Sequence, residues 1–341
     1  MSRALLYCAG GGIGDSLVAS LVARALHGRY ERVDALTLPG HRATLERSPD
    51  LDEVLVDDGG DENALAASLR EANYDACVVT WATARTANVP KLAGIPVRVG
   101  QARRLYSRAF TKQVVVRSET GDVTSHWSGI LLDYARTLDC DTNDLIPSFV
   151  PTPEDVAEAE LLALDDFIIL HPTNAIASQR GIWPVQGWAA LARALAEAFD
   201  CMVVLSGAPG DAAINAAILR QAGDERVVDI AGKLGIGAFG ALAQRARAFV
   251  GITTGTMHVA AAAGAPTVGI FPFQSDFPER WAPLGKRTTV VRATYPCHTG
   301  DTKEHCGDYA CIAHLDLERI VAATESLIGG GRARHDTTLH V

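Results

Sequence analysis

The chain has 341 residues and a net charge of −9 at pH 7, with 48% hydrophobic and 21% charged residues. This length exceeds that of a usual single domain, so we expect two domains of roughly 150 residues each. The composition excludes a disordered chain, and the acidic balance disfavours a nucleic-acid binder, which needs clustered Lys and Arg. The odd number of cysteines, 7, indicates reduced thiols in a cytoplasmic protein. We predict neither a signal peptide nor a transmembrane helix, because the apolar runs are too short.

Short apolar runs alternate with longer helical patterns along the first half, as is typical of a parallel α/β sheet. The pattern predicts strands at residues 4–9, 32–38, 53–56, 75–80 and 113–116. It predicts helices at residues 16–27, 42–47, 62–71 and 86–93. Residues 97–117 do not fit this pattern cleanly and contain no acid, but carry the basic residues Arg98, Arg103, Arg104, Arg108, Lys112 and Arg117.

The prolines Pro147, Pro151 and Pro153 predict a linker at residues 145–154, since proline favours extended backbone. After it the pattern predicts strands at 167–171, 201–206, 226–230, 248–251 and 267–271. Helices are predicted at 186–199, 211–221, 236–245, 256–263 and 315–328. We therefore predict an N-terminal Rossmann-like domain over residues 1–150, a C-terminal one over 151–330 and a polar tail over 331–341. The two domains would face a central cleft, with ligands at the carboxyl ends of the strands.

A glycine-rich turn at residues 10–15, GGGIGD, follows the first predicted strand. Glycines let the backbone approach a ligand, and a helix N-terminus presents unpaired amides. The spacing lacks the G-x-G-x-x-G fingerprint, and the second strand ends without an acid, which disfavours an NAD-dependent oxidoreductase. Asp15 then has two interpretations: it is a helix N-cap, or it is a general base that faces the cleft.

Three strand-end turns in the second half suit a phosphorylated ligand. Residues 253–256, TTGT, offer hydroxyls and amides at a helix N-terminus, and His258 follows, either as a ligand contact or as a structural residue of that helix. The strand end that contains Thr173 leads to Arg180, a combination that predicts an anion clamp. Asp211 ends a third turn, where it would accept hydrogen bonds from a ribose or cap the next helix.

A group of cysteines and histidines near the C-terminus invites a metal interpretation. The spacing C-x8-C-x4-C lacks the close cysteine pair of a zinc knuckle, so we predict a reduced loop or an occasional disulfide rather than a metal site. The residues concerned are Cys297, His298, His305, Cys306, Cys311 and His314.

Several of these segments resemble glycosyltransferase family 9, the heptosyltransferases that build the inner core of bacterial lipopolysaccharide. The family typically opens with a strand and a G-x-(I/L)-G-D turn, which residues 11–15 resemble through Gly12, Gly14 and Asp15. Residues 253–266 resemble its D-T-G-x-x-H-x-A-A-A-x-G-x-P stretch, and residues 280–284 its R-W-x-P-L. The likeness extends over nearly the whole chain, to about residue 327.

The resemblance implies the GT-B fold, with an acceptor site in the first domain near Gly12 and Gly14 and a nucleotide-sugar site in the second. It implies an inverting transfer without metal or cofactor, with heptose as the sugar, an ADP-linked donor and a lipopolysaccharide-core or related glycan as the acceptor. Asp15 would take the proton from the acceptor hydroxyl. The donor would contact Thr173, Arg180, Asp211, Thr253, Thr254, Gly255, Thr256 and His258.

The basic stretch 97–117 has two interpretations. It is a solvated, flexible segment, or it lies beside the cleft, where Arg103 and Arg104 bind an anionic acceptor or the cytoplasmic face of the inner membrane.

On the donor side the chain departs from the family pattern. Relatives usually carry Asp in place of Thr253 and Lys in place of Gly181, and their F-G-P-T-D-P strand end reads FPFQSD at residues 271–276. An alternative function is therefore a degenerate member that binds a nucleotide or a glycan without transfer.

Overall fold

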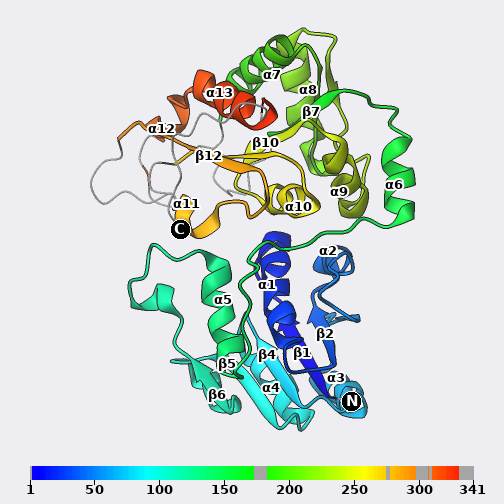
Figure 1. Cartoon of the computed structure of the whole chain (residues 1–341), viewed down its shortest axis with the longest axis vertical. Helices are drawn as coiled ribbons and strands as arrows, with labels where there is room; N and C mark the ends of the chain where they lie inside the picture. The colour runs from blue at the N-terminus through cyan, green and yellow to red at the C-terminus, as the bar shows by residue number, and fades with distance from the viewer. Residues whose placement is uncertain (1, 173–182, 274–276, 297–305, 307–308, 330–341) are drawn as a thin grey trace. The chain divides into compact units, whose positions relative to one another are not determined.

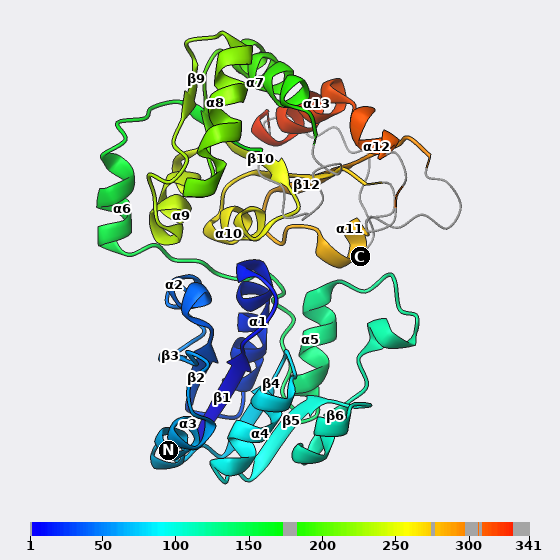
Figure 2. The same cartoon turned by 180° about the vertical axis from the view of Figure 1, so that it is seen from behind.

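The computed structural model describes residues 2–172, 183–273, 277–296, 306 and 309–329. The chain divides into two compact units, Met1–Val150 and Pro151–Val341, each built around one six-stranded parallel sheet (Figures 1 and 2). Among the described residues, no helix combines the length and the apolar character needed to span a membrane.

The first unit alternates strands and helices from its first residues. Its strands are β1 (Arg3–Cys8), β2 (Arg32–Thr37), β3 (Val54–Val56), β4 (Ala76–Val79), β5 (Val97–Gln101) and β6 (Lys112–Val114). Its helices are α1 (Ile13–Leu26), α2 (Arg42–Leu45), α3 (Glu62–Glu71), α4 (Ala84–Leu92) and α5 (Trp127–Arg136). Short 3-10 turns are η1 (Pro39–His41), η2 (Leu105–Ala109) and η3 (Arg117–Thr120).

Both faces of the first sheet are covered by helices. Side chains along β1 alternate: Leu6 packs in the core beneath α1 and α5, whereas Leu5 and Tyr7 pack beneath α3 and α4. All three side chains are fully buried, which explains why β1 reads as a continuous apolar run. The strand order is β3-β2-β1-β4-β5-β6, so the chain reverses its direction across the sheet between β1 and β4.

The second unit repeats this plan. Its strands are β7 (Phe167–His171), β8 (Met202–Leu205), β9 (Val227–Asp229), β10 (Ala248–Ile252), β11 (Thr267–Phe271) and β12 (Thr288–Arg292). Its helices are α6 (Pro153–Glu160), α7 (Val185–Phe199), α8 (Ala212–Ala222), α9 (Ile236–Arg245), α10 (Gly255–Ala263), α11 (Pro278–Trp281), α12 (Ala310–Ala313) and α13 (Leu317–Ile328), with the 3-10 turn η5 (Pro209–Asp211).

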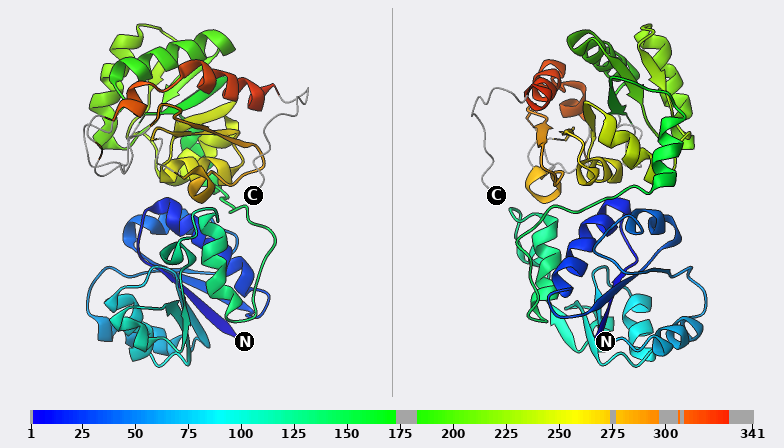
Figure 3. Two further views of the ribbon diagram at one scale, coloured as in Figure 1. Left: turned by 90° about the vertical axis from the view of Figure 1, so that its left-hand side faces the viewer. Right: turned by 45° about the vertical axis from the view of Figure 1, so that its right-hand side comes forward.

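The second sheet is also sandwiched. Trp188 of α7, Ile218 of α8 and Ile320 of α13 are fully buried in one core with the strands. Figure 3 shows green α7 and red α13 on one side of the strands and yellow α10 on the other. The strand order is β12-β11-β10-β7-β8-β9, so the reversal lies between β7 and β10.

Several elements were not expected from the sequence. Strands β5 and β12 and helices α5, α11 and α12 lie in stretches to which no element was assigned, and α6 begins inside the expected linker. Pro153 occupies the first turn of α6, where its missing N–H costs nothing. Thr152 caps that helix by accepting a hydrogen bond from the Asp155 N–H, so the proline-rich stretch ends in a helix start.

Candidate active site

The strand order singles out one crevice position in each sheet. In open parallel sheets a ligand binds at the carboxyl ends of the two strands where the chain reverses. In the first unit these strands are β1 and β4, which end at the glycine-rich turn before Asp15 and at Trp81. In the second unit they are β7 and β10, which end at His171 and at the turn 253–256.

Asp15 is held at the first of these positions by its own turn. Gly12 caps α1, and Asp15 lies at the third helical position, where its Oδ2 accepts a hydrogen bond of 2.8 Å from the Gly12 N–H. Gly11 has φ +68°, and a Cβ there would lie 2.6 Å from Asp15 Cγ, so only glycine fits. The interpretation of Asp15 as the N-cap is wrong, because that position belongs to Gly12.

Two opposing effects act on the Asp15 carboxyl. Burial raises its pKa above the ordinary value, while the Gly12 hydrogen bond and the nearby His41 act against that rise. His41 is buried, with its Nδ1 2.8 Å from Ser16 Oγ, and burial lowers its own pKa. A carboxylate whose pKa is raised by its surroundings is a better proton acceptor than a solvated one.

A small pocket lies beside Asp15. Its volume is about 10 Å³, which is room for about one water molecule. It is lined by Cys8, Gly10, Asp15, Ser16, Thr80, Trp81, Trp127 and Leu131. Trp81, Trp127 and His41 were not expected at this site from the sequence. Trp81 reaches it because β4 pairs with β1, whereas Trp127 comes from the start of α5 and His41 from η1.

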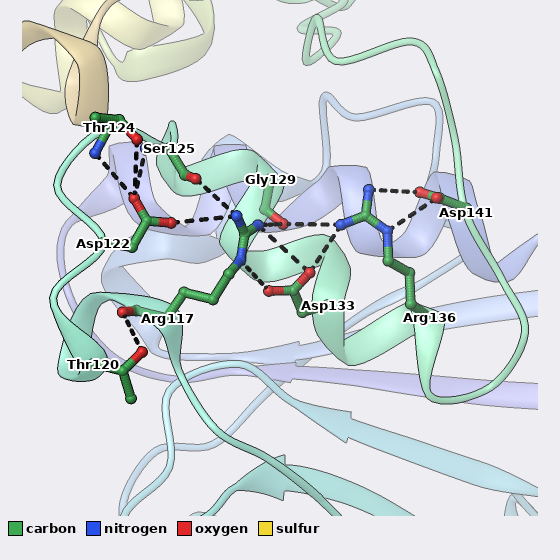
Figure 4. A network of polar contacts seen from close by, with 9 residues as sticks. All are labelled: Arg117, Thr120, Asp122, Thr124, Ser125, Gly129, Asp133, Arg136 and Asp141. Carbon is green, nitrogen blue, oxygen red and sulfur yellow. Dashed lines mark hydrogen bonds and ion pairs between the residues drawn. The ribbon is translucent and has the colours of Figure 1, made fainter.

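An arginine network places the start of α5, and with it Trp127. Figure 4 shows the Arg117 guanidinium between Asp133 of α5 and the preceding loop. Arg117 Nε donates to Asp133 Oδ2 at 2.6 Å, and its Nη groups donate to Ser125 Oγ at 2.7 Å and to the Gly129 carbonyl at 2.8 Å. Arg117 therefore fastens the loop before α5 to the helix.

The remaining basic residues of 97–117 are mostly bound within the first unit. Arg98 donates to the Ala109 carbonyl at 2.8 Å, and Arg104 forms an ion pair with Glu119. Arg103 lies in the turn after β5 with φ +65°, and both Arg103 and Arg104 are exposed. The interpretation of the whole stretch as a flexible segment is wrong, since it forms β5, η2 and β6.

In the second unit, His171 ends β7 and is buried. Its Nδ1 lies 2.9 Å from Ser206 Oγ at the end of β8, and burial lowers its pKa to about 4, so the ring is neutral at pH 7. Asp211 lies close enough for its charge to oppose that shift. Asp211 Oδ2 accepts a hydrogen bond of 2.7 Å from the Ala208 N–H at the start of η5, whereas its side chain makes no capping bond to the next helix, α8.

The turn after β10 forms the N-terminus of α10. Thr254 is the N-cap, with its Oγ1 2.7 Å from Thr256 Oγ1. The Thr253 N–H is bonded to the Ile270 carbonyl of β11 at 3.2 Å. His258 lies in the first turn of α10 and is 8% exposed. The hydroxyls and amides at 253–256 thus gather at the helix end that attracts anions.

Some expected site residues cannot be placed. Thr173, Arg180 and Gly181 lie outside the described residues, as do Cys297, His298 and His305. Within the ranges that are described, no three His, Cys, Asp or Glu side chains gather as a metal site would require.

Comparison with protein families decides the class of protein. Residues 63–308 match glycosyltransferase family 9 (heptosyltransferase). The chain belongs to glycosyltransferase family 9. It is therefore a glycosyltransferase, with homology to enzymes of lipopolysaccharide biosynthesis.

Individual members of the family are distant but cover nearly the whole chain. Lipopolysaccharide heptosyltransferase 2 of Escherichia coli is 25% identical over 93% of this chain and 96% of its own length. The solved structure of E. coli ADP-heptose lps heptosyltransferase II has a TM-score of 0.78 at 23% identity, covering 96% of this chain and 98% of its own. A family 9 glycosyltransferase from Veillonella parvula has a TM-score of 0.80 at 18% identity, covering 96% and 97%. These structures establish the GT-B fold, with two Rossmann-like units.

Proposed function

We propose that this glycosyltransferase transfers heptose from ADP-heptose to a glycan of the lipopolysaccharide core, with inversion at the anomeric carbon. The observation that carries the proposal is the placement of Asp15. Its carboxylate stands at the β1–β4 reversal beside a pocket of one-hydroxyl size, with a pKa raised by burial. The family and the E. coli relative support the choice of heptose, and the solved E. coli ADP-heptose lps heptosyltransferase II supports the choice of ADP.

In the proposed reaction, the acceptor binds the first unit near Gly12 and Gly14, and one of its hydroxyls enters the pocket beside Asp15. Asp15 takes the hydroxyl proton while the oxygen attacks the anomeric carbon. The new bond joins the acceptor oxygen to that carbon, and the bond from the carbon to the β-phosphate oxygen breaks. ADP leaves with the bonding electrons, so negative charge grows on its phosphate.

The second unit would bind the donor. The α10 N-terminus, with Thr254, Gly255 and Thr256, offers amides and hydroxyls to the diphosphate. Arg180 would supply a cation and Thr173 a hydroxyl, while Thr253 and His258 would border the sugar. Asp211 would accept hydrogen bonds from the ribose hydroxyls.

Donor binding is tested by melting the protein with ADP, GDP, UDP, CDP, dTDP and NAD. A ligand at a hundred times its Kd stabilises the protein by about 2.7 kcal/mol, a shift of several degrees. We expect ADP alone to give this shift. Asp211→Asn keeps the acceptor for the Ala208 N–H and removes the charge, so it should weaken ADP binding without lowering the melting temperature. A shift with another nucleotide alone would contradict the ADP assignment.

Thr253 and Gly181 motivate a second candidate, a protein that binds ADP-heptose without transferring the sugar. Thr253 offers a neutral hydroxyl where relatives have a carboxylate. Binding of ADP-heptose without product on any core oligosaccharide would favour this candidate.

We also infer peripheral contact with the cytoplasmic face of the inner membrane. Leu105 of η2 is 89% exposed, and Arg103, Arg104 and Arg108 beside it are exposed as well. An apolar side chain among cations suits an anionic lipid surface. Vesicles with anionic phospholipid should sediment the protein, and Leu105→Ala combined with Arg103→Gln should weaken this. Equal binding to neutral vesicles would refute the contact.

A further inference from the structure

Trp81 occupies the position opposite Asp15 at the β1–β4 reversal. It follows the end of β4, and its ring lies directly over Gly10 at the end of β1. A Cβ on Gly10 would lie 1.9 Å from Trp81 Cδ1 and 2.2 Å from Cγ, so the contact exists only because residue 10 is glycine. The indole nevertheless remains 40% exposed. Tryptophan side chains are highly buried on average, so this exposed indole surface is free to contact a ligand.

The backbone that carries this ring is fixed on both sides. The Trp81 carbonyl accepts a hydrogen bond of 3.2 Å from Thr86 Oγ1, and the next carbonyl, that of Ala82, accepts one of 2.8 Å from the Tyr106 hydroxyl. Thr83 caps α4 and its N–H donates to Thr86 Oγ1 at 2.8 Å. The backbone that carries the ring is therefore fixed before any ligand arrives, which lowers the entropic cost of a contact with the ring.

The pocket beside Asp15 indicates which ligand the Trp81 ring would contact. Trp81 and Trp127 both line it, and its volume of about 10 Å³ accommodates one hydroxyl group but not a sugar ring. A sugar that places a hydroxyl in this pocket must therefore rest its ring on the rim, where the exposed indole lies. The C–H bonds on one face of a pyranose suit the electron-rich face of an aromatic ring.

We propose that Trp81 is an acceptor-binding residue, whose indole stacks on the acceptor sugar that presents its hydroxyl to Asp15. This inference rests on the proposed role of Asp15 as the base. It gives Gly10 a role as well, because any side chain there would displace the ring. Trp81 thus selects for an acceptor that presents an apolar pyranose face beside the reacting hydroxyl.

The test measures acceptor kinetics and acceptor binding with deacylated lipopolysaccharide core oligosaccharides truncated at successive sugars. Trp81→Ala should raise the acceptor KM about tenfold, the upper scale of one aromatic contact, with little change in kcat or in the KM of ADP-heptose. Trp81→Phe keeps a ring and should recover much of the loss. Leu92→Ala, which removes an exposed apolar side chain at the far end of α4, is the control and should leave the acceptor KM unchanged.

A double-mutant cycle adds a sharper readout. Gly10→Ala should raise the acceptor KM in the wild-type background, because its Cβ pushes the Trp81 ring aside. In the Trp81→Ala background the same change should add almost nothing. Additive effects of the two substitutions would overturn the proposal, as would an unchanged acceptor KM in Trp81→Ala.

Failure of the proposed function would look different. If wild-type protein transferred no heptose, titration calorimetry with the same oligosaccharides would still compare wild type with Trp81→Ala. Weaker binding by Trp81→Ala would support acceptor binding by Trp81 even then. Equal binding, or no binding by either protein, overturns it. If Asp15→Asn lost transfer while the kinetics of Trp81→Ala were unchanged, Asp15 would remain the general base, and only the acceptor-binding role of Trp81 would be refuted.

Discussion

Replacing Asp15 with asparagine should lower the transfer rate strongly without destabilising the protein. Asparagine has nearly the same shape, and its Oδ1 can still accept the Gly12 N–H that Asp15 Oδ2 accepts at 2.8 Å. The variant lacks only the charge and the capacity to take a proton. Loss of a general base costs about 100-fold or more in rate, or about 2.7 kcal/mol of transition-state stabilisation.

The stability of the same variant follows from the raised pKa of Asp15. Because the folded protein binds this proton more tightly than the unfolded chain, stability falls as pH rises through the folded pKa, and the ionised carboxylate costs free energy at pH 7. Asp15→Asn removes that cost, so its melting temperature at pH 7 should match or exceed that of wild type. Asp15→Ala also loses the hydrogen bond to Gly12, worth about 1 kcal/mol, and should melt about 2–4 °C lower than Asp15→Asn.

The assay pairs initial transfer rates at saturating donor with melting curves at pH 7. A rate within tenfold of wild type for Asp15→Asn would remove Asp15 from proton transfer. If Asp15→Asn instead melted as low as Asp15→Ala, the rate loss would reflect misfolding, and the account of its burial would fail.

Two further predictions concern the framework of each unit. His171 is buried neutral with a pKa of about 4 against 6.5 in an unfolded chain, so the second unit should lose about 3 kcal/mol of stability as pH falls from 6.5 to 4. In melting curves recorded from pH 6.5 to 4, His171→Asn should lose less stability than wild type. An equally steep loss in the variant would show that another group causes the acid sensitivity. Arg117→Met removes the bonds to Asp133, Ser125 and Gly129, so residues 117–126 should be cleaved faster by protease, whereas the exposed Arg108→Met serves as the control. Equal cleavage of the two variants would show that the arginine network does not order the loop.

The sequence predicted those elements whose burial produces an unbroken apolar run. Strands β7 (Phe167–His171) and β11 (Thr267–Phe271) and helix α9 (Ile236–Arg245) have the expected bounds. Strand β5 was missed because Arg98 interrupts its apolar pattern. The structure accommodates this charge by bonding the guanidinium to the Ala109 carbonyl, a partner that the sequence alone does not reveal.

The candidate site was predicted in part. The G-x-G-D spacing led to Asp15 directly, because its glycines and its acid are adjacent in the chain. Trp81 is 66 residues further along the chain, and reaches the site only because β4 pairs with β1. Strand order is a tertiary property, so periodicity could place Trp81 at a strand end but could not place it beside Asp15.

The most direct test of the proposed function is the anomeric configuration of the product. Wild-type protein is incubated with ADP-heptose and a core oligosaccharide, and the new linkage is followed by NMR from the first turnovers. We predict that heptose is transferred with the configuration opposite to that in the donor, because Asp15 activates the acceptor hydroxyl for direct displacement. A product that retains the donor configuration would contradict this mechanism, and the absence of any heptosylated product would contradict the proposed transfer itself.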